Sequence, residues 1–450
     1  MRITSSKITK YLIILVVLLH LAILLIPLAR IEIFASSYIN KTRTLLFVLI
    51  MLTAVAAGSV RKMKSQSYFI YVEIGLLAIC WIRAFIGDFT SGLKWDDTLE
   101  KLLPYLYPIM ALPLLNLFCT KGWKKESCAL FFIVVSTIDS LLKAFMSFYE
   151  SVSGKILWPN IVVGSMGYRS GLFRINPTPL SILVIPLAFW IFTKTDRRWM
   201  KIVCILTIGV DLIYAYVIWQ ARSALLYKTI LLVALFIFQR TTDKKRVIRY
   251  LILITAVIII INLPFFNNFL DSFSESNAEY GGNTTYRKYA LEYYVQMFYQ
   301  KPFWGVGLLD YTQRRAPLGG TLEDVGFIYS IVQLGIPILA FYLTMFSRSI
   351  YVALIKLRNH HEERLLLLSA TLLYILFGIN IDTFYMYGLT VPFYIAFVEY
   401  FYWETSCETR KLWPHTSVCV PKDKDHSTNL PKLPQPFPAA GDNGIRSEEI

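Results

Sequence analysis

Charged residues are scarce in this sequence. Asp, Glu, Lys and Arg make up 17% of the 450 residues, whereas hydrophobic residues make up 56% and aromatic residues 15%. Soluble globular proteins carry about 25% charged residues, because their water-exposed surface has to be polar. The composition therefore excludes a soluble enzyme or binding domain and predicts an all-α, polytopic integral membrane protein.

Histidine and cysteine are also scarce, with five and six residues. The cysteines fall in predicted helices or on the predicted cytoplasmic side, so no disulfide framework is expected. His20 lies in the first hydrophobic run, and the other histidines lie on the predicted cytoplasmic side or in the tail (His360, His361, His415 and His426). No histidine is therefore expected in a site on the outer face. Repeats with a period of about 20 to 50 residues are absent from the sequence, which excludes a solenoid array.

The sequence contains many long hydrophobic runs. A membrane-spanning helix needs about 20 predominantly apolar residues. The first run is expected to remain as a signal anchor, because no small-residue cleavage site follows it. We expect about twelve transmembrane helices, at 11–29, 44–60, 67–87, 102–119, 128–148, 178–193, 202–219, 221–239, 250–266, 325–346, 365–382 and 385–403.

Lysine and arginine cluster in every second loop, at 61–64, 121–125, 194–201, 239–249 and 348–364. Since positively charged loops stay in the cytoplasm, both termini are expected inside and the loops at about 149–177 and 267–324 outside. The net charge of +15 follows from this topology and from anionic headgroups, so nucleic acid is not an expected partner, whereas membrane lipid is. Residues 1–403 are expected to form the transmembrane domain, and 404–450 a disordered cytoplasmic tail.

Four charged residues inside predicted helices form two possible pairs. Asp139 and Lys143 are four residues apart on one helix, and Asp211 and Lys228 lie on consecutive helices joined by a short turn. Charge at membrane depth is costly unless it is paired. Each pair is therefore expected to neutralise itself.

Arginines gather in three of the predicted outer segments. These are the loop 153–180, the turn 219–226 and the long loop 267–324, which carry Arg169, Arg174, Arg222, Arg287, Arg314 and Arg315. Arginine offers planar, bidentate donors and keeps its charge near a membrane. Their convergence predicts an anionic ligand, and the natural anion at headgroup depth is the diphosphate of a lipid carrier. Arg314 and Arg315 are candidates for glycan binding, although solvation of the loop is the favoured role for both.

The long outer loop contains a predicted helix that ends at Lys301-Pro302. Leu291, Tyr294, Val295 and Phe298 have the i, i+3, i+4, i+7 spacing of one helical face. Asn283 or Thr284 is expected to cap its start. The aromatic density predicts an amphipathic helix at the membrane interface, with Arg287 on its polar side.

Two carboxylates follow in the same loop. Glu323 and Asp324, at the predicted start of the next helix, are candidates for a base that deprotonates an attacking hydroxyl. The alternative is structural, because Thr321 and Asp324 have the spacing of a capping box.

The order of these motifs resembles the family of O-antigen polymerases (Wzy-type) and O-antigen ligases over about residues 160–345. The resemblance rests on the Q-x-R turn (Gln220, Ala221, Arg222), on Arg287 followed by the P-x-x-G-x-G motif at 302–307, and on the Gly335-Ile336 pair. It implies a metal-independent glycosyl transfer, without a cofactor, from a glycan on undecaprenyl diphosphate at the outer face of a bacterial inner membrane. Arg222 and Arg287 would hold the diphosphate, with Arg169 or Arg174 and Gln220 beside them.

The resemblance has one departure. Ligases of the family usually carry a histidine just before the helix that corresponds to 325–346, and this sequence has GGTLEDVGF there. The departure favours a polymerase, which joins lipid-linked repeats and works with a flippase and a chain-length regulator. A ligase that transfers glycan to lipid A-core and a transporter or flippase of lipid-linked sugars remain the alternatives.

Overall fold

The computed structural model describes residues 5–24, 36–56, 69–91, 95–155, 167–169, 171–240, 281–309 and 313–411. By its contacts the chain divides into two units, Met1–Ser406 and Cys407–Ile450. The site and the bundle around it lie in the first unit. The predicted helix at 250–266, the start of the long loop and most of the predicted tail fall outside the described residues.

Helices make up most of the described chain, as the hydrophobic runs predict. They are α1 (Ser5–Leu18), α3 (Ser36–Ala56), α5 (Phe69–Ser91), α6 (Trp95–Leu106), α7 (Ala111–Cys119), α8 (Lys125–Ser153), α9 (Ser181–Lys194), α10 (Arg198–Ile213), α11 (Arg222–Phe238), α14 (Gly281–Gln300), α15 (Ile328–Leu334), α16 (Ile336–Tyr351), α17 (His361–Asn380), α18 (Thr383–Tyr387) and α19 (Val391–Lys411). Two short strands, β1 (Gly167–Arg169) and β2 (Leu172–Arg174), form an antiparallel hairpin, which an all-α prediction does not include.

Five helical segments among the described residues are long and apolar enough to cross a membrane: 69–86, 101–119, 125–153, 198–218 and 336–356. A shorter apolar helix, α9, accompanies them. These segments support a membrane protein, while the expected number of about twelve spans stays a prediction.

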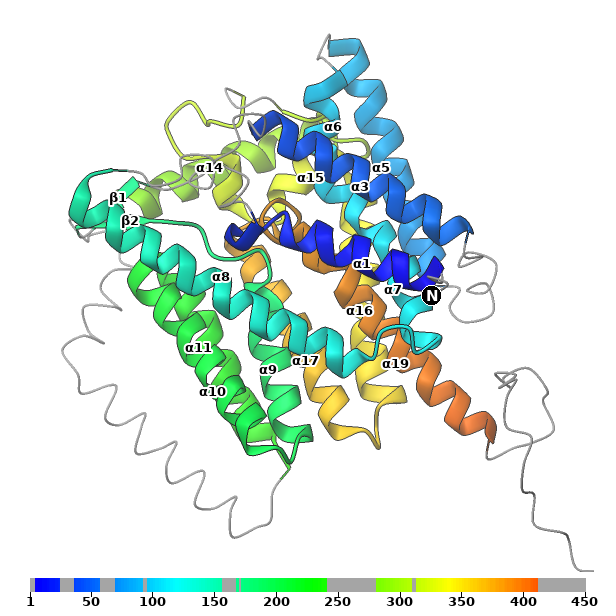
Figure 1. Ribbon diagram of the computed structural model, residues 1–450. Coiled ribbons are helices and arrows are strands. Elements are labelled where there is room, and N and C mark those ends of the chain that lie inside the picture. The colour runs from blue at the N-terminus through cyan, green and yellow to red at the C-terminus, as the bar shows by residue number, and fades with distance from the viewer. Residues whose placement is uncertain are drawn as a thin grey trace, which may run out of the picture. The chain divides into compact units, whose positions relative to one another are not determined.

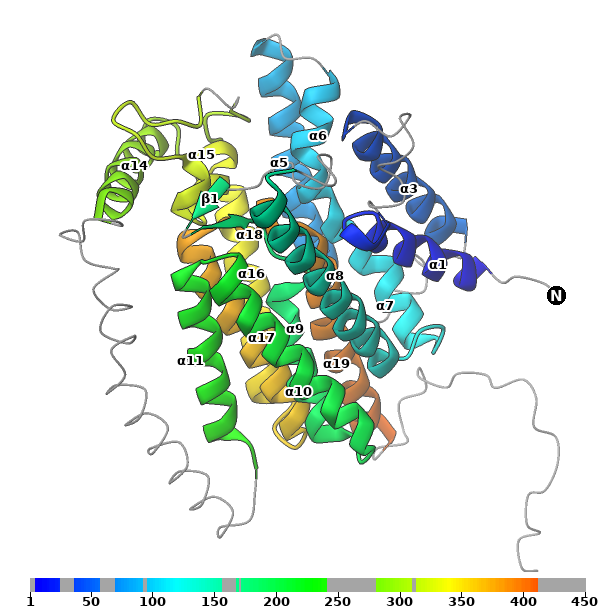
Figure 2. The ribbon, with the colours of Figure 1, turned by 60° about the vertical axis from the view of Figure 1, so that its left-hand side comes forward.

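The centre of the helical bundle is α9. It packs against α8, α10 and α17, as the two ribbon views show (Figure 1, Figure 2). Every residue from Ser181 to Ile191 is buried, which fits a helix that is apolar on all sides. Around this core, α11 packs on α17, and α16 packs on α5 and α17.

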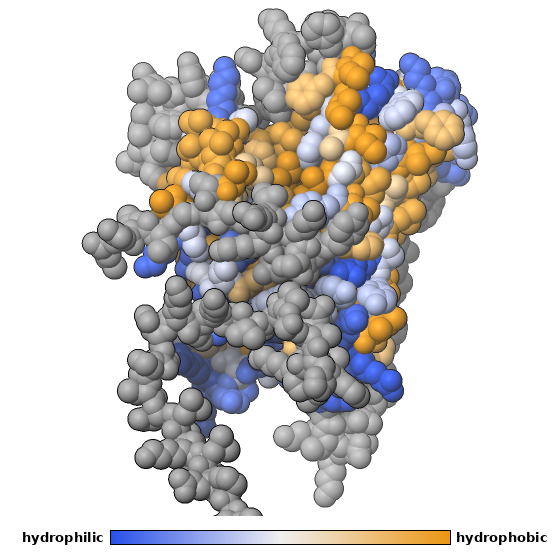
Figure 3. All heavy atoms as spheres, turned by 90° about the vertical axis from the view of Figure 1, so that its right-hand side faces the viewer, coloured by the Kyte–Doolittle hydropathy of each residue, from blue (hydrophilic) through white to orange (hydrophobic). Residues whose placement is uncertain are grey.

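The outer surface of the bundle is apolar over a wide area. Exposed large hydrophobic side chains lie on α3, α5, α8, α10 and α16. On the face drawn in Figure 3, hydrophobic residues gather in one area with hydrophilic residues above and below it. Such a surface would be unstable in water and suits contact with lipid.

Three ion pairs lie inside the described part of the bundle. The expected pairs are confirmed, because Lys143 Nζ lies 3.0 Å from Asp139 Oδ2 and Lys228 Nζ lies 2.8 Å from Asp211 Oδ2. The prediction that Arg348 belongs to a basic cytoplasmic loop is wrong. Arg348 is buried in α16 and binds Glu399 of α19 through two hydrogen bonds of 2.8 and 2.9 Å.

The predicted continuous helix at 325–346 is also wrong. It is interrupted at Gly335, which has a φ of 73° and separates α15 from α16. A Cβ at this position would lie 2.5 Å from the carbonyl oxygen of Phe303. The break therefore results from close contact with the preceding loop, in a backbone conformation that glycine adopts without strain.

Candidate functional site

The β1–β2 hairpin carries two of the predicted arginines to the Q-x-R turn. Arg174 Nε donates to the carbonyl oxygen of Trp219 at 2.9 Å, and Arg169 Nη1 donates to that of Gln220 at 3.5 Å. In return, Gln220 Nε2 donates to the carbonyl oxygen of Arg169 at 3.0 Å. Arg169, Arg174 and Gln220, which the sequence assigns to one site, are therefore brought together.

The turn itself has an irregular backbone. After α10 the chain makes a π-helical segment, Tyr214–Ile218, and Gln220 then adopts a φ of 50°. A side chain in this left-handed region costs about 1 kcal/mol or more, which the contacts with the hairpin offset. Trp219 is buried and stacks on Phe377 of α17, with ring centroids 6.3 Å apart.

The turn places Arg222 at the first position of α11, where its side chain is half-buried. The first N–H groups of a helix have no acceptor within the helix, and its dipole is positive at this end. The end of α11 therefore combines backbone donors with a guanidinium group. Such an arrangement suits an anion.

The predicted helix of the long loop is present as α14 and ends at Gln300, as Pro302 predicts. It begins at Gly281, so the expected caps Asn283 and Thr284 lie inside it. Its packed face keeps Tyr294 and Phe298 of the predicted stripe but is shifted toward Ala290, away from Leu291. Ala290 and Tyr294 are fully buried, with Tyr293, Met297 and Phe298 packed beside them, whereas Leu291 is 43% exposed.

A glycine pair explains this shift. The loop at Gly319-Gly320 lies directly against α14, since a Cβ on Gly320 would come within 3.0 Å of Ala290 Cβ and 2.6 Å of the carbonyl oxygen of Tyr286. Close approach of this loop needs a small residue on the helix, and Ala290 supplies it. The helix therefore turns its alanine inward and leaves Leu291 outside.

Arg287 and Asp324, both predicted catalytic residues, lie next to one another. Arg287 Nη2 is 3.4 Å from Asp324 Oδ1, and the two side chains are 47% and 40% exposed. Asp324 Oδ2 also accepts a hydrogen bond of 3.0 Å from Thr321 Oγ1, at the start of the 3-10 turn Leu322–Val325. The capping box expected from this spacing is not formed, because Thr321 makes no side-chain hydrogen bond to the backbone of the turn. The two side chains instead bind one another, which holds the carboxylate toward Arg287.

Arg314 and Glu323 form a second pair in this loop. Arg314 Nη1 lies 3.2 Å from Glu323 Oε1, and its Nε donates to the carbonyl oxygen of Leu309 at 2.9 Å. The Arg314 guanidinium also lies over the ring of Tyr329. Its side chain is only 12% exposed, so Arg314 braces the loop instead of keeping it hydrated. Arg315 is exposed, and its backbone bridges to Thr321.

The glycine motifs of the family resemblance meet in space. A Cβ on Gly305 would lie 2.3 Å from the carbonyl oxygen of Gln333, and one on Gly335 would lie 2.7 Å from the backbone nitrogen of Gly305. Backbone hydrogen bonds join Val306 to Val332 (2.9 Å) and Ile336 to Pro302 (3.0 Å). The P-x-x-G-x-G segment is therefore seated in the break between α15 and α16, and both motifs serve to hold α14 in place.

α11 links the two groups of arginines. Arg222 is on its first turn, and Tyr227, on its second, is close enough to Arg287 for a Coulomb interaction. Tyr227 in turn accepts a hydrogen bond of 2.5 Å from Asn380 Nδ2, at the end of α17. Arg287 therefore lies within electrostatic range of the second turn of α11, and Arg222 is on the first turn of the same helix.

A buried carboxylate beneath this region was missed by the sequence reasoning. Asp382 is fully buried between α17 and α18 and accepts hydrogen bonds from Ser330 of α15 and, at 3.3 Å, from the Tyr342 hydroxyl. The Tyr105 hydroxyl lies 2.8 Å from Ser330 Oγ. The sequence did contain a signal for this residue, because Asp382 is an acid at the end of a predicted apolar helix. A charge buried there needs partners. The network anchors α15, which follows directly after Glu323 and Asp324.

Burial raises the pKa of Tyr294 to about 12, with Tyr293 and Glu323 adding to the effect, so its hydroxyl stays neutral. No group of three or more His, Cys, Asp or Glu residues in the described part of the chain is placed to hold a metal ion.

The site region can be compared with known families. Residues 208–343 match the O-antigen ligase family. The match begins in α10 and ends in α16, so it contains the Q-x-R turn, α14, both carboxylates and the break at Gly335. The resemblance predicted from these motifs is confirmed for this segment, and the O-antigen ligase family is one of glycosyl-transferring enzymes. No curated protein matches the chain.

Proposed function

We propose that the protein is a polymerase that joins oligosaccharide repeats carried on undecaprenyl diphosphate, at the outer face of a bacterial inner membrane. The observation that supports this proposal is that Arg222, at the start of α11, and Arg287, within electrostatic range of Tyr227 on the same helix, both lie inside the segment that matches the family. Two guanidinium groups and the N-terminus of a helix form a binding site suited to a diphosphate.

In the proposed reaction, a sugar hydroxyl of one lipid-linked repeat attacks the anomeric carbon of the glycan on a second carrier. The bond between that carbon and the diphosphate oxygen breaks as the new glycosidic bond forms. The arginines stabilise the negative charge that develops on the diphosphate. The hydroxyl proton passes to a carboxylate, for which Asp324 is the first candidate and Glu323 the second, or to the departing diphosphate.

The other predicted residues have supporting roles. Arg169 and Arg174 shape the turn that presents Arg222 by donating to its carbonyl groups, and Gln220 of the turn donates to the carbonyl oxygen of Arg169 in return. Arg314 keeps Glu323 in the loop, and Arg315 is exposed on the same loop, where the glycan or water contacts it. A flippase that delivers the repeats and a regulator of chain length would be its partners.

A ligase is the second candidate, because the matching family model is described as O-antigen ligase. Against it stands the absence of a histidine from the segment GGTLEDVGF, where ligases usually carry one. A transporter is less well supported. In a transporter, interrupted helices line the cavity through which the substrate passes. Here the interruption between α15 and α16 is filled by the loop at Gly305.

The test is the length distribution of surface polysaccharide on a gel. Cells that lack the protein are complemented with wild type, Arg222→Ala, Arg287→Ala or the charge-matched control Lys288→Ala, which removes the neighbouring lysine of α14. A polymerase predicts that deletion leaves core bearing a single repeat and that only wild type and Lys288→Ala restore the ladder. Long lipid-linked chains that never reach the core would identify a ligase instead. Full restoration by both arginine variants would reject the site.

A further inference from the structure

The C-terminal part of α8 holds the β1–β2 hairpin through hydrogen bonds to its backbone. Ser151 Oγ accepts a hydrogen bond of 2.8 Å from the backbone nitrogen of Phe173, and Ser147 Oγ donates one of 2.5 Å to the carbonyl oxygen of the same residue. One turn earlier, Lys143 Nζ donates to the carbonyl oxygen of Pro177 at 3.3 Å. Because Lys143, Ser147 and Ser151 are four residues apart, they lie in one line along the helix. This line follows the chain from β2 to Pro177.

The two serines do more than satisfy their own helix. A serine within a helix can donate its hydroxyl to the carbonyl oxygen four residues earlier. Ser151 does so at Ser147, 2.7 Å away, and also accepts the hydrogen bond from the hairpin. Ser147 is fully buried and donates to Phe173 instead. Both hydroxyl groups therefore fix the position of β2 on α8.

A third contact reaches the other strand of the hairpin. Glu150 is 6% exposed and accepts a hydrogen bond of 3.1 Å from the Tyr168 hydroxyl of β1. The Tyr168 ring packs edge-on against the ring of Phe173, with centroids 5.3 Å apart. Tyr168 and Phe173 lie opposite one another in the register of the hairpin. α8 thus binds both strands on one face of the hairpin.

The other face of the hairpin carries the arginines. Side chains alternate between the two faces of a strand, so Arg169, next to Tyr168, and Arg174, next to Phe173, lie on the face opposite to α8. From there they donate to the carbonyl oxygens of the Q-x-R turn. One face of the hairpin is therefore fixed by α8, and the opposite face fixes the turn.

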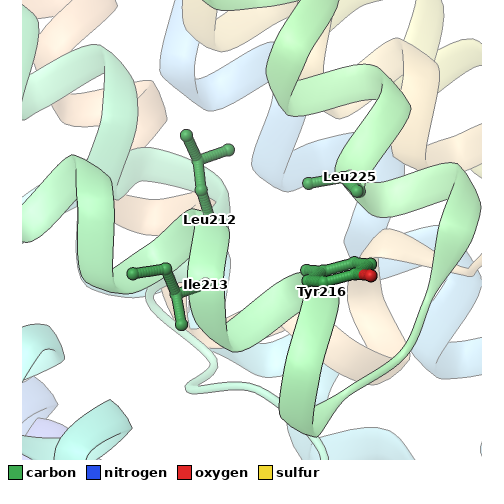
Figure 4. Close-up of a pocket in the computed structure, with 4 residues that line it drawn as sticks. All are labelled: Leu212, Ile213, Tyr216 and Leu225. Carbon is green, nitrogen blue, oxygen red and sulfur yellow. The ribbon is translucent and has the colours of Figure 1, made fainter. Parts of the chain in front are cut away.

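The exposed side of the π-helical segment before this turn is apolar. A pocket between α10 and α11 is lined there by Leu212, Ile213, Tyr216 and Leu225 (Figure 4). Leucine and isoleucine side chains have no donor or acceptor, so they cannot fix the direction of the turn. Hydrogen bonds on the hairpin side do so instead, and Tyr214 of the segment adds one of 3.1 Å to the carbonyl oxygen of Ile175.

We propose that Ser147, Glu150 and Ser151 are positioning residues for the diphosphate of the donor. They fix the hairpin along α8, the hairpin arginines fix the Q-x-R turn, and the turn presents Arg222. The three side chains bind the hairpin and act on substrate only through it. The inference rests on the proposed function, because it concerns the site assigned to the diphosphate. It gives a role in that site to a helix outside the segment that matches the family.

The first experiment measures the dissociation constant of inorganic pyrophosphate from the full-length protein in lipid nanodiscs, by titration calorimetry. Ser151→Ala removes an acceptor of the hairpin backbone, while Ser151→Thr keeps an oxygen in its place. Ser153→Ala is the matched control, because Ser153 is an exposed serine at the end of the same helix. Tyr168→Phe is the second variant. It removes the donor to Glu150 from a side chain that is 57% exposed, so the fold is kept.

Ser151→Ala and Tyr168→Phe should each raise the dissociation constant of pyrophosphate by about two- to tenfold, the range expected for loss of one hydrogen bond. Ser151→Thr and Ser153→Ala should bind as wild type does. Wild-type affinity in both Ser151→Ala and Tyr168→Phe, or an equal loss in Ser153→Ala, would overturn the proposal. A wild-type protein that binds no pyrophosphate would also overturn it.

A double-mutant cycle separates positioning from a general loss of stability. Since Ser151 binds the residue before Arg174, adding Ser151→Ala to Arg174→Ala should weaken pyrophosphate binding no further than Arg174→Ala alone. Effects that add would show that Ser151 acts independently of the hairpin arginines and would overturn the proposal. Coupled effects on pyrophosphate binding in a protein that makes no polymer would reject the polymerase, while the positioning role stands.

Discussion

Arg287, on the second turn of α14, forms an ion pair of 3.4 Å with Asp324 in the 3-10 turn that precedes α15. Both side chains are partly exposed, and exposed pairs of this kind contribute only about 0 to 1 kcal/mol to stability. The pair is therefore weak enough for an incoming diphosphate to replace Asp324 as the partner of Arg287. A residue with such a small structural role can be tested by mutation without loss of the fold.

Arg287→Ala should lower kcat for glycosyl transfer by about 10²- to 10³-fold, the usual loss on removing one donor to a developing charge. The midpoint of thermal unfolding should change little. Arg287→Lys should recover only part of the activity, because lysine lacks the planar pair of donors. Steady-state kinetics of the purified protein, beside Lys288→Ala, measures both effects. Loss of folding in Arg287→Ala would show that the pair is structural.

The strained turn at Gln220 predicts which of two substitutions at this position gives the more stable protein. Gln220→Ala and Gln220→Gly both remove the amide that donates to Arg169, but only alanine keeps a side chain at a φ of 50°. The glycine variant should therefore be more stable than the alanine variant by about 1 kcal/mol. Thermal unfolding in detergent compares them directly. An alanine variant as stable as the glycine variant would indicate a turn that relaxes without the glutamine.

Asp382 should be essential to the fold around α15. Asp382→Ala removes the acceptor for two buried hydroxyl groups, and each unsatisfied group costs about 1 to 3 kcal/mol. Tyr342→Phe removes one donor and leaves Ser330 bound, so it should cost about 1 kcal/mol. Unfolding of both variants, followed by Trp fluorescence, tests this ranking. A Tyr342→Phe variant less stable than Asp382→Ala would contradict it.

The buried group of Arg348, Glu399 and Glu73 predicts that removing the cation destabilises the protein more than removing one carboxylate. Glu73 is 2% exposed and within Coulomb reach of both partners. Arg348→Met leaves the buried carboxylate of Glu399 without its cation and should destabilise the protein by about 3 to 5 kcal/mol. Glu399→Gln should cost less, because Arg348 keeps Glu73 as a counter-charge.

The double variant Arg348→Met, Glu399→Leu provides the control, because it replaces the pair with apolar groups and should recover much of the stability. Protein that remains folded should retain normal transfer activity, since this group is not among the residues assigned to the site. Equal destabilisation by Arg348→Met and Glu399→Gln would exclude a role for Glu73.

The sequence predicted features that depend on local pattern. The helix that ends before Pro302 and the pairs Asp139–Lys143 and Asp211–Lys228 followed from spacing, charge and turn residues. Each of these needs only nearby residues or the cost of charge in a membrane. The grouping of Arg169 and Arg174 with Gln220, 51 residues after Arg169, came from the family resemblance.

What the sequence did not predict depends on contacts between distant segments. The helix at 325–346 looked continuous, because only the docking of Gly305 requires the break at Gly335. The packed face of α14 followed Ala290 instead of Leu291, because the loop at Gly320 needs a small partner. From the sequence, Arg348 was assigned to a loop and Asp382 to the end of a helix. Their burial depends on contacts with Glu399 and Ser330, which are distant in the sequence.

The most direct test of the account uses the purified protein in liposomes that contain only a lipid-linked repeat. Wild type should convert the repeat into a series of longer lipid-linked oligomers with no other acceptor present. Arg222→Ala and Arg287→Ala should reduce this product at least about 100-fold, and Lys288→Ala should not. No oligomer from wild type, or full activity of both arginine variants, would contradict the central claim that these arginines hold the diphosphate of a polymerase.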